Sequence, residues 1–238
     1  VAKYAYRLNS EQRHRCKAFP TDYDSILNQF KKILNHPNDE LLILADGCEI
    51  NGVLALLVEP DDRYIEAIGG VFAEYNYEAT AKEFYKYLKT RYCGYQFDAA
   101  YPEENIQAID FMKSIGARLL GYDFEFKLHK SEYKAFPEMD NIVRLNSKYY
   151  KSFIEIHDKF NPDVYWTGEK LINALDKFNV FIALENDEVI GSVVISNLSN
   201  KTEEIYFIEV EESKQNHGYG TALMNKAIQN AFRNGTDE

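Results

Sequence analysis

Residues 203–225, "EEIYFIEVEESKQNHGYGTALMN", pass from a strand pattern through two glycines into a helix pattern. Residues 205–210 are mostly β-branched or aromatic, which is typical of a strand. After the glycines, apolar residues recur at helical spacing, as at Leu223 and Ala227. Gly218 and Gly220 fall where the helix begins, and a helix N-terminus carries free N–H groups and the positive end of the helix dipole. The stretch therefore predicts a strand, an anion-binding loop and a helix.

The residues upstream of this stretch extend it into a sheet flanked by helices. The expected elements of the second half are a strand at 142–145, helices at 147–160 and 167–178, strands at 180–187, 188–198 and 203–212, and a helix at 221–232. The pair Asn186-Asp187 predicts the hairpin turn between the strands at 180–187 and 188–198.

The first half of the chain has a similar order of elements. The expected elements are a helix at 22–36, strands at 40–45, 52–59 and 64–75, a helix at 77–92, a strand at 95–101, a helix at 104–117 that ends at Gly116, and a closing strand at 118–128. In the first of these helices, the spacing places Ile26, Phe30, Ile33 and Leu34 on one face.

The order helix, helix, strand, strand, strand, helix thus occurs in approximate duplicate, with no clear second helix in the first copy. We expect an α/β (α+β) fold with two domains in tandem, each a mixed, largely antiparallel sheet flanked by helices. The expected boundaries are 1–130 for the first domain, 131–140 for a linker and 141–238 for the second. Residues 93–128 have no counterpart in the second copy, so it is expected to be truncated, or its sheet to be completed by another part of an assembly.

Composition excludes several classes of function. The apolar runs are far shorter than the ~20 residues of a membrane helix, so no membrane span is expected. Three widely spaced cysteines and the absence of an apolar leader indicate reduced thiols and a cytoplasmic protein. The five histidines lack metal-ligand spacing, so no metal is expected. A formal charge of −11 without a basic stripe argues against a nucleic-acid partner.

The glycine loop resembles the signature of a known family. "QNHGYG" fits Q/R-x-x-G-x-G/A of the GNAT superfamily of acetyl-CoA-dependent N-acetyltransferases, and 203–225 looks especially like the histone-type members. The resemblance implies acetyl-CoA as co-substrate and an oxyanion donor from the backbone of Ile208 or Val210. The residues that it assigns to the phosphates are Gln215, Asn216, His217, Gly218, Tyr219, Gly220 and Thr221.

The chemistry of these residues points the same way. Glycines lack a Cβ, so backbone N–H groups can approach a pyrophosphate closely. A dinucleotide fingerprint would need a third glycine where Leu223 stands, and a P-loop would need a Gly-Lys-Ser/Thr run that is absent. The remaining alternative is that Gly218 and Gly220 only make a tight strand-to-helix turn.

Acetyl transfer needs a base to take a proton from the attacking amine. Glu204 stands in register with the glutamate that histone-type members use, and Glu209 lies within an apolar run where burial could tune a carboxyl group. Since strand residues alternate, the two are expected on opposite faces, and the alternative for each is an ordinary solvated carboxylate.

The acceptor is expected to be a primary amine of a small molecule or peptide, near the connection at 161–170 that contains Trp166. The first copy is expected not to bind acetyl-CoA, because residues 71–81 lack the signature and place Glu74 and Glu78 near the phosphate position. The alternative function is a non-catalytic module that senses acyl-CoA or binds protein. A homodimer stays open.

Overall fold

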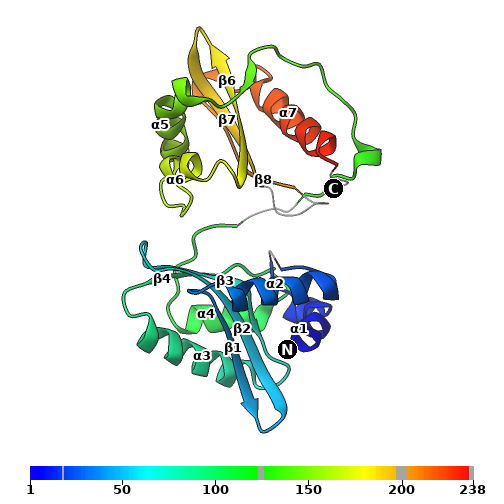
Figure 1. The fold of residues 1–238 in the computed structure, drawn as a ribbon, viewed down its shortest axis with the longest axis vertical. Coiled ribbons are helices and arrows are strands. Elements are labelled where there is room, and N and C mark those ends of the chain that lie inside the picture. The colour runs from blue at the N-terminus through cyan, green and yellow to red at the C-terminus, as the bar shows by residue number, and fades with distance from the viewer. Residues whose placement is uncertain (18, 123–125, 197–202, 236–238) are drawn as a thin grey trace. The chain divides into compact units, whose positions relative to one another are not determined.

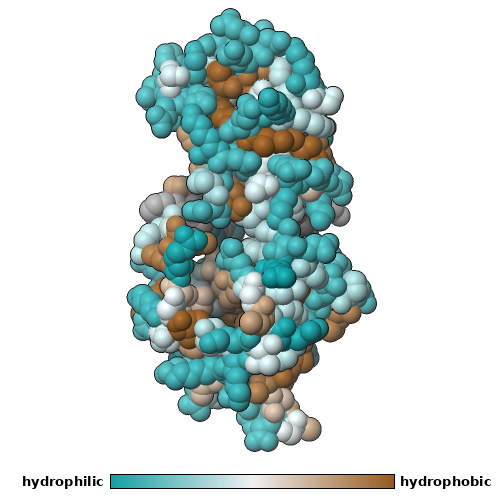
Figure 2. Space-filling view, turned by 90° about the vertical axis from the view of Figure 1, so that its left-hand side faces the viewer, coloured by the Kyte–Doolittle hydropathy of each residue, from teal (hydrophilic) through white to brown (hydrophobic). Residues whose placement is uncertain are grey.

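The computed structural model describes residues 1–17, 19–122, 126–196 and 203–235. The chain divides into two compact units, Val1–Tyr122 and Asp123–Glu238, each with its own sheet (Figure 1). On the face drawn in Figure 2, hydrophilic residues cover most of the surface, and hydrophobic residues show through in separate patches. None of the helices in the described ranges is long and apolar enough to cross a bilayer.

The first unit is a four-stranded sheet in the order β1-β2-β3-β4, with helices on both faces. Only β3 and β4 pair in parallel among the described strands of this sheet. Its elements are α1 (Ala2–Asn9), α2 (Tyr23–Asn35), β1 (Glu40–Asp46), β2 (Glu49–Glu59), β3 (Tyr64–Phe72), α3 (Tyr77–Arg91), β4 (Gln96–Asp98) and α4 (Ile106–Ser114).

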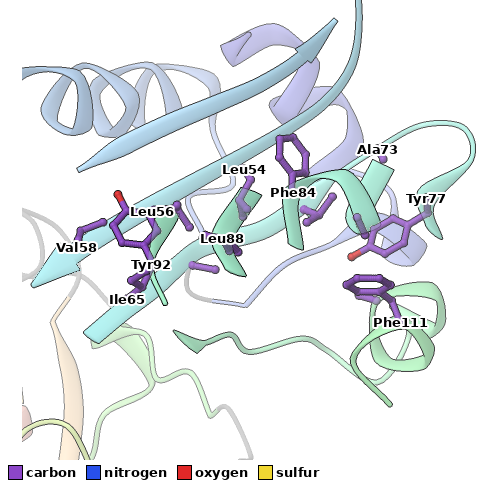
Figure 3. Packing of buried hydrophobic residues seen from close by; sticks show 14 residues of the cluster. Leu54, Leu56, Val58, Ile65, Ala73, Tyr77, Phe84, Leu88, Tyr92 and Phe111 are labelled. Atoms are coloured by element: carbon purple, nitrogen blue, oxygen red, sulfur yellow. The ribbon is translucent and has the colours of Figure 1, made fainter. Parts of the chain in front are cut away.

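Two apolar clusters hold this unit together, one on each face of the sheet. On one face, Phe84 and Leu88 of α3 and Phe111 of α4 pack with strand residues such as Leu54 and Leu56 (Figure 3). On the other face, α1 and α2 cover the second cluster. Alternate residues of β2 enter different clusters, as the period of a strand requires.

Three expectations for the first unit are wrong. The helix α1 was not expected, and with it the unit does have a pair of helices before its strands. Leu34 is 67% exposed, whereas Ile26, Phe30 and Ile33 are buried, so the core face of α2 is narrower than predicted. The structure assigns no strand to the described residues of 118–128, since 118–122 and 126–128 are not paired, and 123–125 lie outside the described residues.

The second unit is also a four-stranded sheet, in the order β5-β6-β7-β8, and all three pairings are antiparallel. Helices α5 and α6 cover one face and α7 covers the other (Figure 1). Its elements are β5 (Ile142–Arg144), α5 (Tyr150–Phe160), α6 (Gly168–Asn173), β6 (Phe178–Glu185), β7 (Glu188–Ser196), β8 (Glu204–Val210) and α7 (Tyr219–Arg233).

The expectations for this unit are confirmed in type and order, with shorter elements. The mixed, largely antiparallel sheets flanked by helices are also as expected. Asn186 and Asp187 both have positive φ, which a two-residue hairpin turn requires. Thr167 caps α6 by accepting from Lys170 N at 3.4 Å. The end of the strand expected at 188–198 lies outside the described residues.

Candidate functional site

The candidate site is the loop between β8 and α7. The chain leaves β8 at Val210, makes one turn of 3₁₀ helix at Glu212–Lys214, and enters α7 at Tyr219. Two loop residues lie in the left-handed region, Asn216 with φ 62° and Gly218 with φ 88°. Asparagine and glycine adopt that region at the lowest cost, which explains why the sequence can turn this sharply here.

The backbone N–H groups of residues 216–221 point away from the hydrogen-bonded structure. Within the described part of the chain, none of these six residues donates its amide N–H to a protein acceptor, and the first helical bond runs from Ala222 N to Gly218 O at 2.9 Å. Unpaired amides at a helix N-terminus, together with the dipole of a 15-residue helix, form a site for an anion.

Polar side chains hold this loop in place. Glu185 on β6 accepts hydrogen bonds from Lys214 Nζ and from Tyr219 Oη, the second at 3.0 Å. The bond to Glu185 raises the pKa of Tyr219, which keeps the phenol a donor. Gln215 donates from Nε2 to Val210 O at 3.0 Å, so its side chain fastens the loop to β8. His217 Nδ1 donates to Gln215 O at 2.7 Å, since a carbonyl can only accept.

A pocket of about 360 Å³ opens beside the loop. Its walls come from β8, from α7 and from the segment before β5, and they are formed by Phe136, Ile208, Gly220, Thr221, Met224, Asn225 and Ile228. Gly220 and Thr221 belong both to this pocket and to the group of unpaired amides. A ligand anchored at the amides can therefore continue into the pocket.

The open edge of β8 offers further donors. Glu211 N donates to Ile190 O at 2.8 Å, toward the β7 side of the sheet. Because N–H groups alternate along an antiparallel strand, those of Ile208 and Val210 point toward the opposite edge. These are the two residues that the sequence suggested as oxyanion donors.

A β-bulge at Tyr206 changes which face each glutamate occupies. Ile195 of β7 pairs with Ile205, and its neighbour Val194 pairs with Phe207, so Tyr206 is an extra residue. Glu204 is opposite Ser196 and Glu209 is opposite Ser192, which lie on the same face of β7. The expectation that the two glutamates face opposite sides is therefore wrong, because a bulge resets the alternation.

Glu209 belongs to a buried polar network beneath β8. Its side chain is 4% exposed; Oε1 lies 3.1 Å from His157 Nδ1 and accepts a hydrogen bond from Ser192 Oγ. His157 Nε2 donates to Trp166 O at 2.9 Å. Burial lowers the pKa of His157, but the hydrogen bonds to Glu209 and Trp166 and the charge of Glu209 outweigh burial and raise it overall. The network ties α5 and the connection before α6 to β8.

Sequence reasoning missed His157, Asn225 and Phe136. A single histidine, asparagine or phenylalanine inside a helix or connection carries no local signal, and each contributes here through partners that are distant in sequence. Trp166, which was singled out for acceptor contacts, packs its ring against Phe178 at 4.8 Å between centroids and supplies its carbonyl to His157.

The corresponding junction in the first unit already holds an anion of its own. Glu74, between β3 and α3, forms a two-pronged ion pair with Arg7, with Nη1 to Oε1 at 2.9 Å. Its backbone N donates to Tyr4 Oη at 3.0 Å. Asn76, with φ 48°, stands where the helix begins, a position that Gly218 occupies in the second unit.

Residues 140–238 match the model of the acetyltransferase (GNAT) family. The second unit therefore contains a GNAT-family acetyltransferase domain. The matched residues are less than half of the chain, and the family assignment rests on them.

Solved structures of similar fold include three enzymes of this kind. The aminoglycoside 6'-N-acetyltransferase from Enterococcus faecium is 17% identical over 40% of this chain and 57% of its own, with a TM-score of 0.36. Ard1 from Thermoplasma volcanium is 21% identical over 40% and 65%, with a TM-score of 0.35. A GNAT family acetyltransferase from Elizabethkingia anophelis with acetyl-CoA bound is 24% identical over 41% and 62%, with a TM-score of 0.32. The chain thus spans less than two thirds of each. Comparison with curated proteins finds no match.

Proposed function

We propose that the second unit transfers an acetyl group from acetyl-CoA to a primary amine of a small molecule or peptide. The observation that carries the proposal is the group of unpaired amides at residues 216–221, which faces the start of α7 in a domain of the GNAT family. These amides would receive the pyrophosphate of acetyl-CoA, and the pocket beside Gly220 and Thr221 would receive the chain that leads to the thioester.

Each protein group then has a chemical task. When bound, acetyl-CoA supplies the activated acetyl group. The outward N–H of Ile208 or Val210 would donate to the thioester oxygen as it gains negative charge. The amine must lose a proton in order to attack, and we assign that proton to Glu204, because Glu209 is buried and held by His157 and Ser192.

Hydrogen exchange tests the phosphate site directly. Because the amides of 216–221 have no protein acceptor, they should exchange rapidly in the free protein and slowly once CoA is bound. The amides of 74–80 in the first unit should be unaffected, since Glu74 and Arg7 occupy that junction. Exchange at 216–221 that does not change at saturating CoA would contradict the proposal, and protection at 74–80 would contradict the assignment of an empty first unit.

The role of Glu204 is tested by Glu204→Gln. With the amine that the wild type acetylates, we expect kcat to fall by about a hundredfold, the lower end of the effect of a general base, with an unchanged Kd for CoA. The residual rate should rise with pH, because the amine then deprotonates in solution. Thiol release measures the rate, and Glu188→Gln, at the opposite end of β7 from the residue that pairs with Glu204, is the control.

A wild-type rate for Glu204→Gln would remove Glu204 from the mechanism. CoA binding by the wild type without thiol release for any amine in a broad panel would instead favour the non-catalytic alternative, an acyl-CoA sensor.

A further inference from the structure

The segment that precedes β5 runs along α7, and we call residues 126–140 the strap (Figure 1). Near the end of α7, Lys130 Nζ donates to Phe232 O at 3.2 Å, and the rings of Tyr133 and Phe232 meet edge to face with centroids 5.5 Å apart. Glu138 lies 3.6 Å from both Lys226 and Arg233. The strap is thus attached to the helix at several points along its length.

Asn225 fixes the strap in the middle of α7. This side chain is buried, and its amide bonds both backbone groups of Phe136: Oδ1 accepts from Phe136 N at 3.3 Å and Nδ2 donates to Phe136 O at 3.1 Å. Oδ1 also accepts from Tyr133 Oη. A buried amide with these partners has a defined orientation, so the backbone position of Phe136 is set by α7.

The side chain of Phe136 enters the wall of the pocket beside the amides. It is 56% exposed, although its backbone is held on both sides. The same pocket includes Ile208 of β8 and Met224 of α7. An aromatic ring that is held beside an apolar pocket and left half open has unburied area for a ligand to cover.

We propose that Phe136 is a specificity-determining residue for the acyl donor, which packs against the pantetheine arm and is held there by Asn225. This inference rests on the proposed function. A donor whose diphosphate sits on the amides of 216–221 must pass Gly220 and Thr221, and these two residues line the pocket that Phe136 closes. The strap thereby supplies one wall of the donor channel from outside the sheet and helices of the domain.

Calorimetry with two probes tests this role. CoA carries the pantetheine arm, and adenosine 3′-phosphate 5′-diphosphate carries the diphosphate without the arm. Phe136→Ala should weaken CoA binding about tenfold and leave the affinity for the second probe unchanged. Phe126→Ala is the matched control, because Phe126 lies in the same strap, is 90% exposed and does not line the pocket. Phe136→Leu, which keeps apolar bulk, should lose less than Phe136→Ala.

The outcomes separate this inference from the proposed function. Wild-type protein that binds neither probe would overturn both. Wild-type binding with an unchanged CoA affinity in Phe136→Ala would overturn the role of Phe136 alone. An equal loss for the two probes would also overturn it, because a defect of the amide loop, and not a lost contact with the arm, would then be the cause.

Discussion

Replacing Gly220 by glutamate is expected to abolish CoA binding without destabilising the domain. A Cβ at Gly220 would meet only Val210 Cγ2, at 3.9 Å, so the fold has room for a side chain there. Glutamate is a better helix former than glycine by up to about 1 kcal/mol, and a carboxylate in the first turn of α7 complements the helix dipole. The same carboxylate would repel a diphosphate on the neighbouring amides, which should lower the affinity by about a hundredfold or more.

Gly220→Gln separates charge from bulk. It has nearly the size of glutamate and no charge, so it should lose less CoA affinity than Gly220→Glu, and its affinity should depend less on salt concentration. Thermal unfolding of both variants checks the stability. If Gly220→Glu binds CoA as tightly as the wild type, the loop is only a strand-to-helix turn and the proposed site is wrong.

The second large effect concerns the buried network of His157 and Glu209. Replacing His157 by leucine leaves the carboxylate of Glu209 buried with Ser192 as its remaining hydrogen-bond partner within the network. Breaking a buried ion pair from one side costs about 3–5 kcal/mol. Since Trp166 is the only tryptophan and its carbonyl accepts from His157, its fluorescence during urea denaturation reports on this unit.

The double variant His157→Leu/Glu209→Leu is the control for this loss. Because it removes both charges, it should recover most of the stability that His157→Leu loses. If the double variant is as unstable as the single one, the cost comes from packing and not from the unpaired carboxylate.

The same pair predicts how stability depends on pH. The pKa of His157 is raised above its unfolded value of about 6.5, so its contribution is fully present below that pH and is lost as pH rises through the folded-state pKa. The free energy of unfolding of the wild type should therefore decrease across that window. His157→Gln should show a flatter curve there, and a curve identical to that of the wild type would exclude this assignment.

Much of the fold could be predicted because its signals are local. The hairpin at Asn186-Asp187, the periodicity of α7 and the glycine at the N-terminus of α7 each depend on residues within a few positions. The expected strand at 118–128 had the right alternation of side chains. It failed in the described residues because a strand exists only with a partner, and alternation does not supply one.

The sequence by itself determined that the loop at 215–221 joins a strand to a helix with glycine where the backbone must turn, and that an anion could bind there. Only the tertiary structure decided what surrounds this loop. The bulge at Tyr206 placed Glu204 and Glu209 on one face, and contacts across 52 and 89 residues joined His157 to Glu209 and Phe136 to Asn225. Backbone turning is set by neighbours in the chain, whereas a buried hydrogen bond requires two distant side chains to meet, and that meeting is set by how sheet and helices pack.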